Sequence, residues 1–344
     1  MPLASAPARI LIRLPTWVGD VVMATPAIRA VTSAYPQAEV TCEGRPLLRE
    51  LVIGLAGVDA FLAEPGKRWR DLRPRVSALR KGRFDLAVVL PDSHRAALGP
   101  FLARIPHRIG YQQDLGRRLM LTQHLPIPQE NGKPRPSSMI ERFLRLTRMA
   151  GIPDDGHHME VPIDELTRDG LAERFRQANF QAGAGYAVAV PGASFGPSKQ
   201  WPPEYFAKVA EEIYRRHGWP LVIAPSGEET HIAQAIASSA KTPVLVLDSP
   251  VLGLLQLAAL IDQAQVCISN DTGPRHFAVA LHTPVVVPIG STDPRYTNHQ
   301  LERQRVLSAD VDCAPCGLKV CPIDHRCMTH LKPKAVLEAV EELL

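Results

Sequence analysis

The chain has 344 residues, of which 45% are hydrophobic and 22% are charged, and its mean hydropathy is close to zero. This length suits two domains of ordinary size, and no apolar run is long enough to span a bilayer. Residues 1–9 have neither the basic start nor the apolar core of a signal peptide. We therefore expect a cytoplasmic protein without a transmembrane segment.

The net charge of +4 conceals an asymmetry. Residues 1–150 hold 23 Lys and Arg against 12 Asp and Glu, and the remainder holds 16 against 23, so the two parts carry +11 and −7. One interpretation is a solvated basic surface without a partner. The other is that the first half meets an anionic partner, such as a phosphorylated lipid at a membrane surface. Nucleic acid fits less well, because no nucleic-acid reading motif accompanies the arginines.

Short apolar runs alternate with helical patterns in the first half of the chain. The patterns predict strands at residues 9–14, 38–42 and 84–90, and helices at 21–34, 93–103 and 139–150. Four prolines in residues 125–138 argue against regular structure there. Strands that alternate with helices indicate right-handed crossovers and a parallel sheet.

The alternation restarts in the second half. Strands are predicted at residues 186–191, 220–224, 244–247, 266–269 and 284–289, and helices at 203–216 and 228–239. The fold class is therefore α/β, with two doubly wound halves joined near residues 165–183. Sheets of this kind bind ligands beyond the carboxyl ends of their strands, and two facing halves would make a cleft.

Residues 269–276, Ser-Asn-Asp-Thr-Gly-Pro-Arg-His, are the most informative stretch. An apolar run precedes them and the helical pattern of residues 277–281 follows, so a buried strand delivers a polar loop onto a helix start. Such a loop presents backbone N–H groups and the positive end of a helix dipole to an anion. We expect a phosphate group there.

Three other junctions between a strand and a helix carry unusual residues. Asp20 would lie in the first turn of its helix, where an acid can also serve only to complement the helix dipole. Residues 191–202 combine glycines and small residues, among them Ser194, with Lys199, which suits phosphate, although the loop is no Walker A motif. Residues 225–229 place carboxylates where a ribose hydroxyl could be bound. Each of these signals is weak by itself.

Four of the six cysteines fall within fifteen residues. Closely spaced thiols in a cytosolic protein suggest metal more often than disulfides. The spacing nevertheless lacks the two separated Cys-x2-Cys pairs of a zinc ribbon, so reduced cysteines that pack a compact loop are the favoured alternative. The other two cysteines lie in predicted strands and are expected in the core. The four clustered residues are Cys313, Cys316, Cys321 and Cys327.

The order of these junctions resembles glycosyltransferase family 9, the ADP-heptose:lipopolysaccharide heptosyltransferases, over nearly the whole chain. Several spaced motifs in the right order are far more specific than any one of them. The matching segments are residues 17–20 (Trp-Val-Gly-Asp), 89–93, 105–108, 191–193 (Pro-Gly-Ala), 195–197, 199–202 and 270–273 (Asn-Asp-Thr-Gly).

The resemblance implies a GT-B architecture, in which two Rossmann-like domains face each other across a cleft. Residues 1–170 would bind the acceptor, a lipid-linked anionic oligosaccharide at the inner membrane surface, with peripheral association of the enzyme there. Residues 171–344 would bind the nucleotide sugar, and would include the Cys-rich loop 313–327 and a last helix that often crosses back to the first domain. The basic first half agrees with a phosphorylated acceptor.

The implied reaction is inverting transfer of L-glycero-D-manno-heptose from ADP-heptose to the first heptose of the Kdo-lipid A inner core. Asp20 matches the catalytic base, which takes a proton from the acceptor hydroxyl. Lys199 matches the phosphate-binding lysine, Asp271 an acid that contacts the donor, and Glu229 the acid near the adenosine ribose. Backbone groups of Thr272 and Gly273 would stabilise the departing ADP.

Two features of the donor loop depart from the family pattern, because Pro274 and Arg275 precede His276. Proline fits an early helix position but removes one N–H donor. Arg275 could add charge near the diphosphate or point into solvent. His276 could contact the donor or pack the helix.

Alternative functions remain open on the sequence alone. The nearest is another family 9 transferase with a different sugar or acceptor, and a nucleotide-sugar epimerase of the same architecture is a second. A non-catalytic nucleic-acid or metal-binding protein is a third. On this interpretation the transfer needs no cofactor and no metal, since Lys199 and helix amides could hold the diphosphate.

Overall fold

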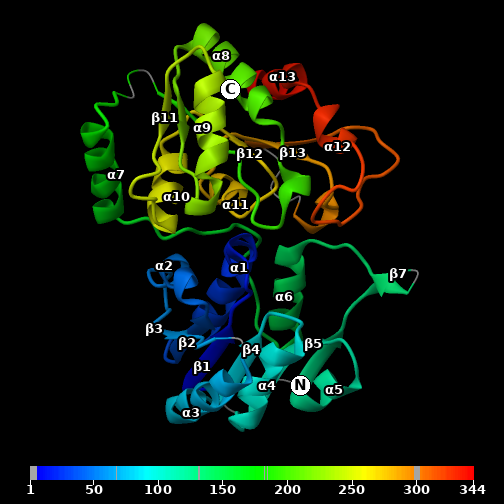
Figure 1. Cartoon of the computed structure of the whole chain (residues 1–344). Coiled ribbons are helices and arrows are strands. Elements are labelled where there is room, and N and C mark those ends of the chain that lie inside the picture. The colour runs from blue at the N-terminus through cyan, green and yellow to red at the C-terminus, as the bar shows by residue number, and fades with distance from the viewer. Residues whose placement is uncertain (1–5, 67, 131, 182, 184, 298–302) are drawn as a thin grey trace. The chain divides into compact units, whose positions relative to one another are not determined.

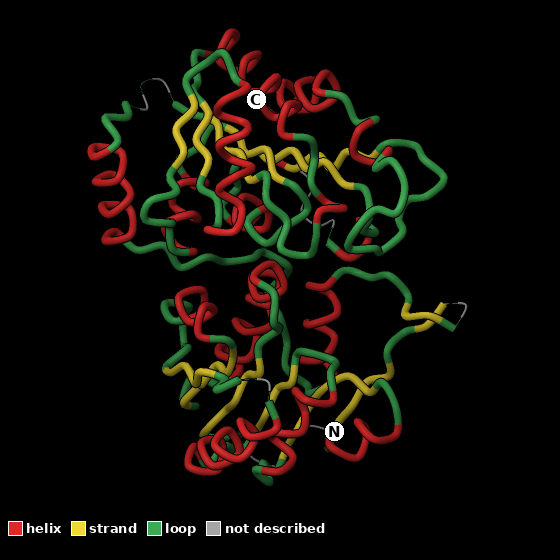
Figure 2. The backbone as a smooth tube through the Cα atoms, in the orientation of Figure 1, coloured by secondary structure: helices red, strands yellow, loops and turns green. Residues whose placement is uncertain are grey.

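The computed structural model describes residues 6–344 apart from residues 67, 131, 182, 184 and 298–302. Of residues 1–9, which were not expected to form a signal peptide, the first five lie outside the described part. The chain divides into two compact units, Met1–Pro162 and Ile163–Leu344 (Figure 1). In each unit a parallel sheet lies between helices, as Figure 2 shows. Among the described residues, no helix is both long enough and apolar enough to cross a bilayer.

The first unit has a six-stranded parallel sheet in the order β3-β2-β1-β4-β5-β6. Its strands are β1 (Arg9–Arg13), β2 (Glu39–Gly44), β3 (Ala60–Ala63), β4 (Leu86–Val89), β5 (His107–Gln112) and β6 (Gln123–Pro126). Its helices are α1 (Val18–Ala34), α2 (Arg49–Val52), α3 (Leu72–Gly82), α4 (His94–Leu102), α5 (Leu115–Met120) and α6 (Met139–Met149). The central strands β1 and β4 are buried along almost their whole length, because helices cover both faces of the sheet.

The helices of the first unit form two layers. Helix α3 packs beside α4 and α4 beside α5, whereas α1 packs beside α6. This arrangement follows from the strand order. From β1 to β2 the chain moves across the sheet in one direction, and from β4 to β6 it moves in the other. Because the crossovers are right-handed, the helices of the two series lie on opposite faces. Helices α3, α4 and α5 therefore cover one face of the sheet, and α1 and α6 cover the other.

The second unit repeats this plan with the order β11-β10-β9-β12-β13-β14. Its strands are β9 (Ala187–Val190), β10 (Leu221–Ile223), β11 (Val244–Val246), β12 (Val266–Ser269), β13 (Val285–Ile289) and β14 (Gln304–Ser308). Its helices are α7 (Glu165–Gln177), α8 (Pro203–His217), α9 (Thr230–Ser239), α10 (Leu254–Asp262), α11 (Arg275–Ala280), α12 (Arg326–Thr329) and α13 (Pro333–Leu343).

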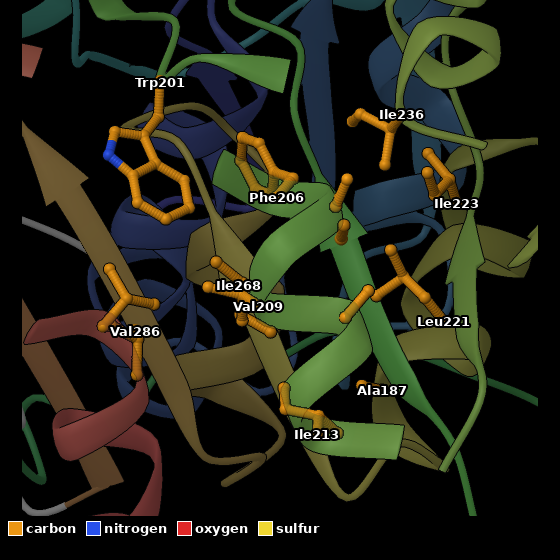
Figure 3. Close-up of a cluster of buried hydrophobic side chains, with 14 of the residues drawn as sticks. Ala187, Trp201, Phe206, Val209, Ile213, Leu221, Ile223, Ile236, Ile268 and Val286 are labelled. Carbon is orange, nitrogen blue, oxygen red and sulfur yellow. The ribbon is translucent and has the colours of Figure 1, made fainter. Parts of the chain in front are cut away.

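A core between α8 and the sheet holds the second unit together (Figure 3). Phe206 and Ile213 recur on one face of α8 and pack on Ile223 and Ile268 of the strands. Trp201, which is fully buried just before α8, donates its indole N–H to the carbonyl oxygen of Leu331 at 2.8 Å. This packing fixes the segment before α8, which carries the candidate donor loop.

The predicted α/β fold with two doubly wound parallel sheets is confirmed, and the predicted strands lie within about two residues of the observed ones. The expectation of irregular structure at residues 125–138 was wrong in part. Strand β6 ends at Pro126, and β7 (Gln129–Glu130) pairs antiparallel with β8 (Lys133–Pro134). Proline is tolerated in β6 because it lies at the end of an edge strand.

The structure also defines the boundary between the two units and the packing of the last helix. The suggested junction, residues 165–183, contains helix α7, and the boundary between the units falls before it. The last helix, α13, packs against α8 and strands β13 and β14 of its own unit. Strands β3, β5 and β14 escaped prediction because they are short, only partly buried or rich in polar residues.

Candidate active site

Both sheets reverse their strand order at one place. In the second unit the chain moves in one direction from β9 to β11 and in the other from β12 to β14, so the reversal lies between the neighbouring strands β9 and β12. In the first unit it lies between β1 and β4. Doubly wound sheets bind ligands at the carboxyl ends of the strands at such a reversal. Asp20 follows β1, Lys199 follows β9 and Asp271 follows β12, whereas Glu229 follows the next strand, β10.

In the second unit, the loops after β9, β12 and β13 meet at the Asp271 carboxylate. The Lys199 Nζ lies 2.7 Å from Oδ2 of Asp271 and 3.1 Å from its backbone carbonyl oxygen. Thr292 donates its hydroxyl to the same Oδ2 at 2.6 Å, and Arg275 donates to Oδ1 at 2.6 Å. The structure thus brings together Lys199 and Asp271, which lie 72 positions apart in the sequence.

The Asp271 carboxylate is held in its ionised form. Burial opposes ionisation, but the charges of Arg275 and Lys199 and the hydrogen bonds from Lys199 and Thr292 outweigh it. Together they hold the pKa of Asp271 well below its usual range. A carboxylate that stays charged at every physiological pH fixes the Lys199 ammonium in one position.

Arg275 is fully buried, which excludes the expected alternative that it points into solvent. Besides Asp271, its guanidinium binds the carbonyl oxygen of Thr297 at 3.0 Å and Oε1 of Gln304 at 3.2 Å. Its side chain therefore joins the donor loop to β14 and to the loop that precedes it. The residue that departs from the family pattern is part of the internal support of Asp271.

Asn270 joins the two loops at the strand-order reversal. Its Oδ1 accepts the backbone N–H of Trp201 at 3.0 Å, and its amide donates to the carbonyl oxygen of Pro191 at 2.5 Å. The side chain is fully buried. One amide thus fixes both ends of the loop 191–201, a role that the sequence motif alone did not reveal.

The carboxylate of Glu229 lies against the backbone of Gly192, at the start of the same loop. A Cβ atom built on Gly192 would come within 2.1 Å of Glu229 Oε1. Ser226 donates its hydroxyl to Glu229 Oε2 at 2.7 Å. The predicted donor-site acid is therefore next to the Pro-Gly-Ala loop, in which Ser194 is exposed to solvent. Only glycine at position 192 admits this approach.

The start of α11 offers fewer free amides than the pattern predicts. The N–H of Thr272 already donates to the carbonyl oxygen of Asn270 at 2.7 Å, in a tight turn. Position 274 is proline and has no N–H. In the described chain neither the Asp271 N–H nor the Gly273 N–H makes a backbone hydrogen bond, so these two amides of the turn are available to an anion. His276 is 4% exposed and packs inside the unit.

The Cys-rich loop, residues 313–327, fastens the donor loop through Ser198. The Ser198 N–H donates to the carbonyl oxygen of Lys319 at 3.1 Å, and its hydroxyl donates to that of Leu318 at 2.5 Å. His325 Nε2 lies 2.9 Å from the Ser198 carbonyl oxygen. At Gly196, a Cβ atom would come within 2.4 Å of the Lys319 oxygen. The loop thus holds the residue that precedes Lys199.

The six cysteines have free thiols. Burial and the neighbouring thiols of Cys313, Cys321 and Cys316 raise the pKa of Cys327. No group of three or more His, Cys, Asp or Glu side chains in the described residues is arranged to hold a metal ion. Cys42 and Cys267 are buried in strands, as predicted, and burial raises the pKa of each to about 12.

In the first unit, Asp20 lies in the first turn of α1, at the carboxyl end of β1, as predicted. The loop after β4, the neighbouring strand, is held by the buried guanidinium of Arg117, which donates to the carbonyl oxygens of Pro91 at 2.6 Å and of Ser93. Desolvation lowers the pKa of Arg117 to about 10. Sequence reasoning missed this residue, because nothing near position 117 marks it.

Thr292 and Asn270 were also missed as structural partners of the site. Thr292 follows the apolar run of β13, so the rule that site residues follow parallel strands could have found it. Asn270 belongs to a recognised motif, but the pattern does not show which groups its amide binds. The partners of a side chain depend on which strands are neighbours in the sheet, and the strand order cannot be read from the sequence alone.

The comparison with known proteins now decides the family. A family model described as "Glycosyltransferase family 9 (heptosyltransferase)" matches residues 74–326, well over half of the chain. The chain belongs to glycosyltransferase family 9. It is therefore a glycosyltransferase, as the ordered motifs predict.

Family 9 members resemble this chain over almost its entire length. It is 28% identical to lipopolysaccharide heptosyltransferase 2 of Escherichia coli over 87% of either chain. It is 28% identical to lipooligosaccharide heptosyltransferase 2 of Haemophilus ducreyi over 98% of this chain and 99% of that one. The solved E. coli ADP-heptose lps heptosyltransferase II superposes with a TM-score of 0.79 at 25% identity and covers 97% of this chain. The expected GT-B fold class and the expected resemblance to the family 9 heptosyltransferases are both confirmed.

Proposed function

We propose that this family 9 enzyme transfers L-glycero-D-manno-heptose from ADP-heptose to the first heptose of the Kdo-lipid A inner core, with inversion at the anomeric carbon. The observation that carries the proposal is the Lys199–Asp271–Thr292 cluster at the strand-order reversal of the second unit. In this cluster the family's donor motifs come together, and the Lys199 ammonium is held in a position where it can bind an anionic diphosphate. The names of the similar heptosyltransferases support the sugar and the acceptor.

Lys199 would bind the diphosphate of the donor. Its ammonium has three N–H donors, two of which are directed at oxygens of Asp271, so one remains for a phosphate oxygen. The Gly273 N–H would add a second donor as negative charge develops on the departing ADP. Asp271 would orient the ammonium, while Thr272, Ser194 and His276 stay predicted members of the donor site.

Glu229 would bind the adenosine ribose. Its Oε2 already accepts a hydrogen bond from Ser226, which leaves Oε1 for a ribose hydroxyl. Its position against Gly192 lets the backbone of the loop and the carboxylate contact the same nucleotide. This arrangement supports the assignment of residues 171–344 as the nucleotide-sugar domain.

Asp20 would act as the general base in the first unit, the acceptor domain of residues 1–170. A carboxylate within hydrogen-bond reach of the acceptor hydroxyl takes its proton as that oxygen attacks the anomeric carbon and ADP leaves from the opposite face. The reaction needs neither a redox step nor an added cofactor. The position of Asp20 beside the strand-order reversal of its sheet supports this role.

The acceptor would be a lipid-linked anionic oligosaccharide at the inner face of the cytoplasmic membrane, where the enzyme associates peripherally. The surplus of 11 positive charges in residues 1–150 supports an anionic partner for the first unit. Nucleic acid stays the less suitable partner, because the chain lacks a nucleic-acid reading motif.

A mass-spectrometric assay tests the proposal. The protein is incubated with ADP-heptose and heptosyl-Kdo-lipid A, and the lipid should gain the mass of one heptose. Asp20→Asn, which keeps the shape of the side chain, should lower kcat by roughly 100- to 10,000-fold, while Asp59→Asn, in a loop of the same unit, is the control. If the lipid gains no heptose, the substrate assignment is wrong. If Asp20→Asn keeps full activity, Asp20 is not the base. A panel of nucleotide sugars identifies a different family 9 donor, and isomerised donor without lipid product indicates epimerisation.

A further inference from the structure

We propose that one face of the first unit docks on an anionic phospholipid surface. This face, the basic layer, is formed by the helices, turns and loops of residues 68–120, among them the 3-10 turn η2 (Trp69–Asp71) and helices α3, α4 and α5. Strands β4 and β5 of the same range belong to the sheet beneath it. The proposal deepens the proposed function, and rests on it only in that a lipid-linked acceptor requires the enzyme at a membrane.

Most of the positive charge of the first half resides in this layer. Residues 68–120 hold 12 Lys and Arg against 4 Asp and Glu, a surplus of 8 out of the 11 in residues 1–150. Eight of the 12 basic side chains are exposed, namely those of Arg68, Arg70, Arg73, Arg80, Lys81, Arg83, Arg104 and Arg118. Within the described part of the chain, only Arg70 of these eight belongs to a salt bridge. The exposed acid of the layer, Asp114, pairs with His94.

On the opposite face of the same sheet, two arginines form salt bridges, unlike most of the exposed arginines of the basic layer. Arg29 of α1 binds Asp155 and Glu160, and Arg148 of α6 binds Glu141. Their charges are neutralised within the fold. The crossover rule places α3, α4 and α5 together on the other face. Most of the exposed cations of the first unit that lack a salt bridge in the described residues therefore lie in this layer, and Arg45, Arg49, Arg135 and Arg145 lie outside it.

The basic layer also exposes large apolar side chains. Trp69 is 81% exposed, and Leu115 and Leu119 of α5 are 69% and 70% exposed. The two leucines are four residues apart and therefore lie on the same side of α5, with the exposed Arg118 beside them. Basic groups around exposed Trp and Leu are the composition that enters the headgroup region of an anionic bilayer.

Lipid fits this surface better than nucleic acid does. Nucleic acid would use the arginines but has no hydrocarbon region to receive two leucines. A bilayer receives both groups, because phosphates meet the cations and the acyl boundary meets the apolar side chains. The helices also begin at the carboxyl ends of the strands that precede them, so Trp69 and Leu115 lie toward the edge of the sheet where Asp20 begins α1.

Vesicle sedimentation with the full chain tests the proposal. Vesicles of phosphatidylcholine with phosphatidylglycerol, free of any acceptor, should bind the protein, and vesicles of phosphatidylcholine alone should not. A basic side chain near an anionic bilayer raises affinity roughly fivefold, so the triple variant R73Q/K81Q/R118Q should bind on the order of 100-fold more weakly. The matched control K208Q/K241Q/K334Q removes three exposed lysines of the second unit and should bind like the parent protein.

A second pair of variants tests the apolar part. L115S/L119S should weaken binding and should leave the melting temperature unchanged, because both side chains are already exposed. The control L166S/L344S changes two exposed leucines of the second unit and should retain binding. Equal binding by all these variants and the parent, or binding to both kinds of vesicle alike, overturns the proposal. Tight binding to an oligonucleotide without vesicle binding overturns it in favour of nucleic acid.

Activity separates this proposal from the proposed function. With an acceptor stripped of its acyl chains, R73Q/K81Q/R118Q should transfer heptose at the parental rate, whereas with acceptor embedded in anionic vesicles it should be slower. Loss of both activities would place these residues in acceptor binding and overturn the docking role. Charge-dependent vesicle binding without any heptose transfer would leave the docking surface standing and overturn the proposed function.

Discussion

Arg275→Met removes a fully buried cation from Asp271 while it keeps an unbranched side chain at the same place. The Asp271 carboxylate then retains Lys199 and Thr292 but loses its bond at Oδ1. Removal of one partner from a buried ion pair costs about 3–5 kcal/mol. We expect the lower end, about 3 kcal/mol, because two partners of Asp271 remain.

The second unit should therefore melt about 6–12 °C lower in the Arg275→Met protein, since each kcal/mol shifts a domain of this size by about 2–4 °C. Calorimetry or urea unfolding measures the change. The control is Arg295→Met, which removes an exposed arginine that pairs with Asp293 in the adjacent loop and should cost below about 1 kcal/mol. Equal stability of the two variants would refute the reasoning that Arg275 supports Asp271.

The pH dependence gives an independent check of the same pair. The pKa of Asp271 is lowered in the folded protein, so its contribution to stability is present above the ordinary pKa of 3.8 and is lost as the pH falls toward the folded pKa. Without Arg275 the folded pKa rises and this contribution shrinks. The difference in free energy of unfolding between parent and Arg275→Met should therefore narrow below about pH 4, and a constant difference down to pH 2 would contradict the assignment.

Three further predictions concern the donor site. Gly192→Ala should raise the KM for ADP-heptose at least about tenfold, because its methyl group would collide with Glu229. The control is Gly227→Ala, whose methyl group would meet open space. Equal KM values for the two variants would argue against the contact. Lys199→Met should lower kcat/KM by on the order of 100-fold through loss of charge at the diphosphate, with Lys208→Met as the control; parental kinetics would remove Lys199 from the donor site. EDTA should leave the initial rate unchanged, and loss of activity that added Mg²⁺ restores would show that the transfer needs a metal.

Much of the fold could be read from local patterns. The apolar runs that became β9, β12 and β13 are bounded by glycine, proline or polar residues, and a parallel strand buried on both faces must be such a run. Partly buried strands such as β3 and β14 carry no such signal. Helix α7 was missed because its apolar face is narrow and its buried residues are few.

The sequence by itself determined the two doubly wound halves, the asymmetry of charge and the order of motifs that marks glycosyltransferase family 9. It also placed Asp20, Lys199 and Asp271 after strands, because a loop residue next to an apolar run is a local feature. Only the tertiary structure decided that Arg275 and Thr292 share the carboxylate of Asp271, and that one helical layer holds most of the exposed arginines of the first unit. Those outcomes depend on which strands lie side by side and on the face to which each crossover turns, and both are set by packing between segments far apart in the chain.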